Sequence, residues 1–418
     1  MNKTSVKSWL NDPITRLGSM NFFTMMILTL YRGYLPIYLT NDIIVSIVIF
    51  TIIISSINFF QIFMRIPLGN LSQVVGRKPM ILIGNFSINV AVLLLFIANN
   101  FVLVFISALL VGIGMSCHWP ASFSYIQDTN IGNNYGKNNG RIFKLGDLGI
   151  LLGSLYAKIF LDQFLLDLRL FFFTMSILGF FAIILFYFIL PESLDDDHKV
   201  HITLKEFIHE NFVNMIAKFK EITFYPGMLR IYMLQISLSF AEFFMVVFFP
   251  LLLDSQGYSK GTLGEIIFWA TFVLLWLKPY LGSVSDRFGY RSPVLFTLTG
   301  LALLYLSAPL ISGLIVLIVY YFIVYLLIFI GYPSVNNGAA STSPVKQRGL
   351  ALGALGVYTS LGRSSSTIIM SPIWEQFNIN DTFIISGIFI LILVFILYFI
   401  TKDHNNLQTN TNNVINAD

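Results

Sequence analysis

The sequence predicts an all-α membrane protein with about 12 transmembrane helices, arranged as two pseudo-symmetric six-helix halves. Three observations support this fold class. Of the 418 residues, 56% are hydrophobic and only 11% are charged, whereas a soluble domain carries about 25% charged residues. The apolar residues come in runs of about 20, the length that crosses a bilayer as a helix. A short polar motif also recurs about half a chain later, which indicates that the architecture was built by doubling.

Composition excludes several other classes of protein. Long apolar runs with few turn signals are not those of a membrane barrel. The single Cys117 excludes a disulfide framework and a multi-cysteine metal site, and we expect neither a cofactor nor a metal. The net charge of +4 does not require a nucleic-acid partner, because the basic residues fall in short loops. Arg32 interrupts the first apolar run, so we do not expect a cleavable signal there.

The apolar runs divide the chain into twelve predicted spans: 20–39, 43–64, 80–98, 101–125, 140–161, 169–190, 227–253, 261–281, 293–310, 313–333, 348–370 and 382–401. The domains that follow are an N-terminal six-helix half (1–190), a linker (191–226), a C-terminal six-helix half (227–401) and a tail (402–418). Within the linker, residues 199–220 have the pattern of an amphipathic helix that is too polar to cross a membrane.

The distribution of Lys and Arg predicts the orientation of the spans. Most basic residues fall in loops on the same side as the N-terminus, and the opposite loops hold little beyond Arg169 and Lys260. We therefore expect a multi-pass protein of the cytoplasmic membrane whose termini and linker are cytoplasmic. The lipid bilayer is then its surrounding medium, and we expect a monomer.

The recurring motif reads RIPLGNLSQVVGRKPM at 65–80 and KPYLGSVSDRFGYRSPVL at 278–295. Both copies resemble the loop after the second helix of each half in transporters of the major facilitator superfamily. The resemblance covers the chain from about 21 to 400 and implies the fold of that family and solute transport by alternating access. It assigns a conformational switch to the residues Gly69, Gly76, Arg77, Gly282, Asp286, Arg287, Gly289 and Arg291.

The first copy departs from the family pattern, because Gln73 and Val74 replace an Asp-Arg pair. The usual Arg partner on the fourth helix is also absent, with Ala108 in its place. We therefore expect Asp286 to act through its charge, bound to Arg141 or to a helix N-terminus, and Gln73 to have no such role. The fifth span lacks the Gly-Pro signature of the family's antiporters, which disfavours a drug/proton antiporter.

Three ionisable residues fall near the middle of predicted spans, where a charge is costly and normally faces a cavity or a partner. At 1.5 Å per residue, Arg32 lies ~18 Å and Glu242 ~22 Å into their spans, and Arg363 lies at a similar depth. The spans concerned line the central cavity in the resembled fold. One interpretation is a substrate site with Arg32, Glu242 and Arg363, together with Trp119. The other is a structural ion pair that locks the halves together.

His118 and Asp147 form a second candidate pair, at a common depth of ~10 Å on neighbouring spans. Since His titrates nearest neutral pH, this pair could bind a transported proton, and Glu242 is a further proton-coupling candidate. The alternatives are a hydrogen-bonded contact between helices, or Asp147 paired with Lys144 on its own helix.

No catalytic motif is present in the sequence, so we expect no enzymatic activity. The predicted function is secondary active transport of a small organic solute, driven by protons, through a midplane site between the halves. Arg32 and Arg363 favour an anionic metabolite as substrate. The aromatic content and the Trp-Pro-Ala-Ser stretch at 119–122 favour efflux of amphiphilic compounds or drugs from a mainly aromatic cavity. A non-transporting membrane sensor is a third possibility.

Overall fold

The structure, a computed structural model, describes residues 12–129, 135–165, 167–194, 206, 215–281, 284–344 and 347–402. Most of the predicted amphipathic helix at 199–220, Gly282, the side chain of Asp286 and the tail beyond 402 lie outside these residues.

Long helices occupy the position of each predicted span, and the described residues contain no strand. These helices are α2 (Pro13–Ile37), α3 (Ile47–Val75), α4 (Arg77–Ile97), α5 (Phe101–Asp128), α6 (Tyr135–Lys158), α7 (Leu168–Ile189), α10 (Met228–Ser255), α11 (Lys260–Leu281), α13 (Arg291–Ser307), α14 (Leu314–Thr342), α15 (Arg348–Gln376) and α16 (Ile379–Lys402). Short π-helical turns extend α2 and α6, as η1 (Tyr38–Asp42) and η2 (Ile159–Gln163). Two shorter helices complete the described chain, α9 (Met215–Thr223) and α12 (Val284–Phe288). The predicted all-helical fold is confirmed.

Within the described residues, ten of the helices are long and apolar enough to cross a membrane. The two remaining long helices, α6 and α15, are more polar. They carry Asp147 and Arg363, two of the ionisable residues that the sequence singled out. A spanning helix can hold such residues where it faces other helices instead of lipid.

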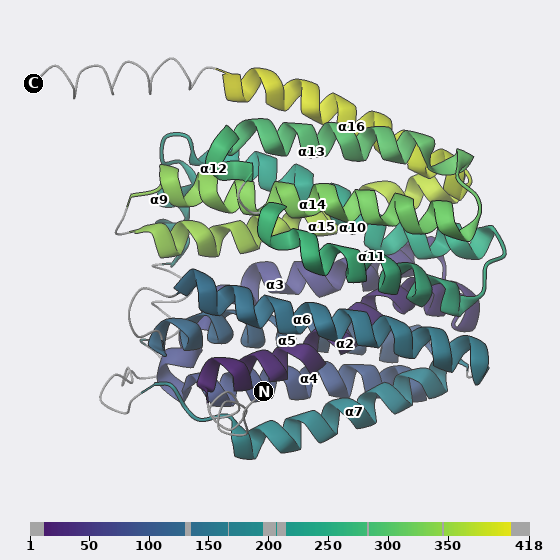
Figure 1. Ribbon diagram of the computed structural model, residues 1–418, viewed down its shortest axis with the longest axis horizontal. Helices are drawn as coiled ribbons and strands as arrows, with labels where there is room; N and C mark the ends of the chain where they lie inside the picture. Colours follow the sequence, from purple (N-terminus) through teal and green to yellow (C-terminus); the bar gives the residue numbers. More distant parts are fainter. Residues whose placement is uncertain are drawn as a thin grey trace, which may run out of the picture. The chain divides into compact units, whose positions relative to one another are not determined.

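The chain divides into two compact units. The first unit comprises residues 1–214 and 245–276, and the second comprises 215–244 and 277–418. In the first unit α2 packs on α6 and α7, and α5 packs on α3 and α4 (Figure 1). In the second unit α13 packs on α14 and α16, and α15 packs on α14, α16 and α9.

The division follows the chain differently from the predicted halves, because residues 245–276 belong to the first unit. These residues comprise the last part of α10, the turn after it and most of α11. Polar contacts explain this placement. The carboxylate of Asp162 accepts hydrogen bonds from Gly261 N (3.1 Å) and Ser259 Oγ (2.9 Å). Lys158 Nζ lies 2.8 Å from Asp162 and 2.7 Å from Glu265. These bonds hold the start of α11 against the end of α6.

Glycines allow the helices of the first unit to approach closely, as their spacing in the sequence indicates. A Cβ at Gly84 on α4 would lie 2.7 Å from the carbonyl oxygen of Gly114 on α5. A Cβ at Gly149 on α6 would collide with the backbone of Phe22 on α2. Side chains at these positions would separate the helices, so the glycines permit the close packing.

Candidate functional site

Glu242 on α10 and Arg363 on α15 form a two-point ion pair in the second unit. Arg363 Nε donates to Glu242 Oε2 at 2.9 Å, and Nη2 donates to Oε1 at 3.2 Å. The side chains are only 17% (Arg363) and 12% (Glu242) exposed. The planar guanidinium matches a carboxylate in this fork geometry, which an ammonium group cannot reproduce. Of the two arginines that the sequence selected, Arg363 is therefore the one that pairs with Glu242.

Tyr332 on α14 adds a third helix to this pair. Its hydroxyl donates to Glu242 Oε2 at 3.0 Å and lies 3.3 Å from Ser239 Oγ. Gln235, one turn before Ser239 on α10, donates to Ser239 Oγ at 3.0 Å and to Thr359 Oγ1 at 2.7 Å. A continuous polar chain thus joins the apolar helices α10 and α14 to the more polar α15.

Tyr332 could not be recognised from the sequence. Its spacing shows nothing unusual in an aromatic-rich span, and only the rotation of α14 brings its hydroxyl to Glu242. We call Glu242, Arg363 and Tyr332 the charged cluster. It can hold a proton on the carboxylate, or release the guanidinium to an anion when the carboxylate is neutralised.

Arg32, the other selected arginine, lies on α2 in the first unit. Its Nη2 approaches the sulfur of Met115 on α5 at 2.8 Å, and Gln61 on α3 also points to this sulfur at 3.7 Å. The neighbouring Tyr31 hydroxyl bonds to Ser107 Oγ at 2.9 Å. A thioether is a weaker acceptor than a carboxylate, so this contact differs in kind from the ion pair of Arg363.

His118 is buried in the first unit and bonds to α4 instead of α6. Its Nδ1 lies 3.0 Å from Asn85 Nδ2, and Asn85 Oδ1 accepts a hydrogen bond from Thr24 Oγ1 at 2.5 Å. His118 Nε2 has no hydrogen-bond partner among the described residues. His118 is therefore not hydrogen-bonded to Asp147, the other member of the candidate pair, which is itself buried on α6. The reason lies in Gly84 and Gly114, which draw α5 against α4 and turn His118 toward Asn85.

Trp119 belongs to a group of stacked aromatic rings in the first unit. Its ring stacks on Phe123 at 5.8 Å and on Phe143 of α6 at 6.1 Å between centroids. Such stacking positions the indole ring firmly, and the residue is only partly buried.

The first predicted switch loop is held by carboxylates that come from outside the motif. Gly76 adopts a φ of +114°, a conformation that favours glycine. Arg77 Nε bonds to Asp128 Oδ2 at 2.9 Å, and its backbone N–H donates to Glu192 Oε1 at 2.9 Å. Glu192 thus lies at the N-terminus of α4, where a negative charge is favourable. This partner was not predictable from the sequence, because Glu192 lies more than 100 residues away from Arg77.

The second predicted switch loop is described only in part. Gly289 has a φ of +68°, and Arg287 is exposed. Arg291 Nε donates to Thr401 Oγ1 at 2.8 Å and its Nη2 to the carbonyl of Tyr398 at 2.9 Å. These bonds fix the start of α13 to the end of α16.

Arg141 is one of the two partners predicted for Asp286. It lies in the first unit, where it bonds to Asp12 Oδ2 at 2.7 Å and to Thr15 Oγ1 at 2.8 Å. These contacts hold the start of α2 against α6.

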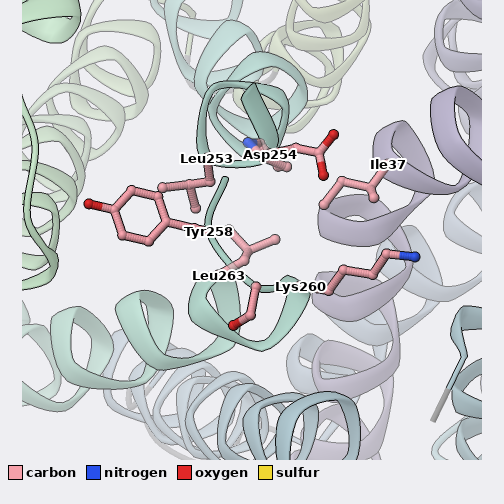
Figure 2. Close-up of a pocket in the computed structure, with 8 residues that line it drawn as sticks. Ile37, Leu253, Asp254, Tyr258, Lys260 and Leu263 are labelled. Carbon is pink, nitrogen blue, oxygen red and sulfur yellow. The ribbon is translucent and has the colours of Figure 1, made fainter. Parts of the chain in front are cut away.

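A small cleft in the first unit lies at the turn between α10 and α11 (Figure 2). It is lined by Ile37, Pro250, Leu253, Asp254, Tyr258, Ser259, Lys260 and Leu263. The charged groups of this lining bond to neighbouring residues. Asp254 accepts from Asn41 Nδ2 at 3.1 Å, and Lys260 Nζ lies 3.6 Å from Asp42. We interpret the cleft as a feature of helix packing.

The fold and the charged cluster define a multi-pass helical membrane protein with ionisable groups inside its spans. The family model of the Major Facilitator Superfamily matches residues 17–367 and 231–415. The chain belongs to this superfamily of membrane transporters.

Solved structures of transporters show the same fold. A mutant of the nucleoside transporter NupG is similar with a TM-score of 0.78 and 13% identity, over 93% of this chain and 100% of that chain. The peptide transporter POT in complex with sulfate gives a TM-score of 0.70 and 14% identity, over 96% and 98%. The human organic anion transporter MFSD10 gives a TM-score of 0.65 and 15% identity, over 93% of this chain and 99% of that chain. None of the curated proteins compared with the chain matches it.

Proposed function

We propose that the chain is a secondary active transporter that moves a small organic solute by alternating access, coupled to protons. The observation that carries this proposal is the charged cluster of Glu242, Arg363 and Tyr332 inside membrane-spanning helices. A charge in hydrocarbon costs at least ~2.5 kcal/mol, so such groups persist where they serve a solute or proton path.

Glu242 is the proton-coupling group that the geometry supports best. When its carboxylate takes up a proton, it loses the charge that holds the Arg363 guanidinium in the fork. Arg363 can then turn to an anionic group of the solute. Arg32 is the candidate for direct contact with an anionic substrate, since Glu242 is engaged by Arg363. His118 and Asp147 are secondary candidates for proton coupling, because His118 bonds to neutral Asn85.

The structural neighbours do not choose between substrate classes, because they include carriers of nucleosides, peptides and organic anions. Efflux of an amphiphilic compound is the second candidate function. It is favoured by the stacked rings of Trp119, Phe123 and Phe143. For both functions we propose a monomer in the cytoplasmic membrane with both termini in the cytoplasm, as the basic loops indicate.

The test is transport in proteoliposomes against a panel of anionic, neutral and cationic solutes, with and without a pH gradient. We expect uptake or efflux of one class of solute that the pH gradient accelerates. Glu242→Gln should abolish this acceleration, because the amide cannot exchange a proton. Equal transport with and without the gradient would overturn the proton coupling, and no transport of any solute would overturn the function.

A further inference from the structure

A cation lies over a tyrosine ring at the predicted cytoplasmic end of each half. In the first unit, Lys78 Nζ lies 5.4 Å from the centroid of the Tyr187 ring, where α4 begins and α7 ends. In the second unit, the guanidinium carbon of Arg291 lies 5.2 Å from the centroid of the Tyr398 ring, where α13 begins and α16 ends. Both distances are within the ~6 Å over which an aromatic face attracts a cation. The two pairs thus have the same construction, although they belong to different units.

The two pairs also occupy corresponding positions of the sequence repeat. Arg291 follows Lys78 at an offset of 213 positions, and Tyr398 follows Tyr187 at an offset of 211. The side chains of Tyr187 and Tyr398 are 60% and 46% exposed. The next residue in each case is an exposed phenylalanine whose ring meets the tyrosine edge to face. Exposed rings bury little area within their own unit, so packing does not explain why both halves have them.

An exposed apolar row leads from each tyrosine toward the middle of its span. The helices α7 and α16 are the two least buried of the candidate spans in the described part of the chain. Along both helices the exposed residues recur at intervals of four, three and four positions, which places them on one face. The rows are Ile177, Phe181, Ile184 and Phe188 in α7, and Ile388, Ile392, Phe395 and Phe399 in α16. Each member of the second row lies 211 positions after its counterpart in the first. In a spanning helix such a face contacts the acyl chains of lipids.

Neither cation forms an ion pair with a carboxylate of the described residues. Arg291 donates to the hydroxyl of Thr401 and to the carbonyl of Tyr398, and both acceptors are neutral. Glu192 bonds to the backbone N–H of Lys78 at 3.2 Å, so a negative charge lies near the first pair. Among the described residues, the positive charge of the second pair is therefore the less compensated of the two.

We propose that the two pairs bind the headgroups of anionic phospholipids, one lipid in each half. The lipid phosphate accepts charged hydrogen bonds from the ammonium or guanidinium group, and the tyrosine ring holds this cation at the membrane surface. The acyl chains run along the exposed row. The pairs lie on the predicted cytoplasmic side, where membranes carry their anionic lipids. The apolar row beside each cation favours a lipid over a soluble phosphate, and the inference does not depend on the identity of any solute.

Native mass spectrometry of the full-length protein in detergent tests the proposal, with phosphatidylglycerol as the anionic lipid and phosphatidylcholine as the zwitterionic comparison. We expect two tightly bound phosphatidylglycerol molecules per chain and much weaker binding of phosphatidylcholine. Lys78→Gln and Arg291→Gln should each weaken the binding of one phosphatidylglycerol by about 10-fold or more, since a charged hydrogen bond is lost. The double variant should retain neither lipid. Because Glu192 lies near the first pair, the lipid lost in Arg291→Gln should be the tighter one.

Matched variants separate the two sites from general charge and from folding. Lys220→Gln removes an exposed lysine of α9 that lies over no ring of the described residues, and should leave both lipids bound. Arg291→Lys gives up the guanidinium bonds at the end of α16 but keeps the charge, and should retain the second lipid. Tyr398→Leu removes the ring, and should weaken the second lipid about 3-fold. Lys78→Gln removes no side-chain hydrogen bond of the described residues, so misfolding does not explain a loss of lipid there.

Three results would overturn the inference. They are a wild type that does not prefer phosphatidylglycerol, a double variant that keeps both lipids, and a Lys220→Gln variant that loses as much lipid as Lys78→Gln. Glycerol 1-phosphate, which has the phosphate but no acyl chain, should not displace the bound lipids. Displacement at equal concentration would show sites for a soluble anion instead of a lipid.

Discussion

Replacing Glu242 with a neutral residue measures most directly how much the charged cluster contributes to the free energy of unfolding. Glu242→Gln keeps the shape of the side chain but leaves the Arg363 guanidinium without its opposite charge, at a site where the two side chains are 12% and 17% exposed. Removing one partner of a buried ion pair costs about 3–5 kcal/mol, and residual exposure places this pair near the lower end. We expect a loss of about 3 kcal/mol in the free energy of unfolding, equivalent to a roughly 100-fold change in the ratio of folded to unfolded protein.

A double-mutant cycle isolates the pair from other effects of the substitutions. Arg363→Gln should also lower the free energy of unfolding. The double variant Glu242→Gln with Arg363→Gln should lose about 2 kcal/mol less of this free energy than the sum of the two single losses. The measurement is unfolding of the purified protein in detergent by a denaturant. Glu221→Gln is the matched control, because this exposed residue bonds only to an exposed amide of Gln347 among the contacts described. Additivity within about 0.5 kcal/mol would refute the coupling.

Arg32 and Arg363 should respond differently to replacement by lysine. Arg363→Lys cannot make both bonds to Glu242, so it should reduce the amount of folded protein. Arg32→Lys should leave protein levels unchanged and raise the apparent KM for an anionic solute. Transport assays in proteoliposomes and quantification of folded protein distinguish these outcomes. If both variants retain transport and expression, the hypothesis of a charged substrate site is wrong. Efflux from a mainly aromatic cavity is then the better hypothesis.

Three further predictions concern the scaffold. Gly149→Ala should lower the melting temperature, because its Cβ would meet the backbone of Phe22, whereas Gly353→Ala, with no described atom within 4 Å of the new Cβ, should not. Asp286→Asn should slow transport far more than Gln73→Ala, and equal effects would show that the two switch loops are alike. A cysteine introduced at position 205 should resist membrane-impermeant labels applied to intact cells, and labelling there would reverse the predicted orientation.

The helices were predictable from the sequence because each apolar run must be long enough to cross the hydrocarbon. Even α6 and α15 were placed correctly, although composition alone does not distinguish them as spans. Depth along a helix also follows from counting residues, so Glu242 and Arg363 could be assigned to a common level. Their bond then required only that the two helices face each other, which the fold of the superfamily provides.

Contacts that depend on helix rotation were not predictable in the same way. His118 and Asp147 share a depth, but the close approach of Gly84 and Gly114 turns His118 toward Asn85.

The repeated residues of this chain shape its scaffold, and we propose that the unrepeated charged residues carry its chemistry. Pro36 and Pro250 correspond at an offset of 214 positions, and this offset places Leu28 opposite Glu242 and Val246 opposite Arg32. The motifs that shape helices and loops are therefore shared by both halves, while Arg32 and Glu242 each stand opposite an apolar residue of the other half. A doubled scaffold gives two symmetric sets of helices that can rock between equivalent arrangements. A solute has no such symmetry, so its charged partners need to differ between the halves. We therefore propose that the loops keep the repeat because they serve the scaffold, and that Arg32, Glu242 and Arg363 depart from it because they serve transport.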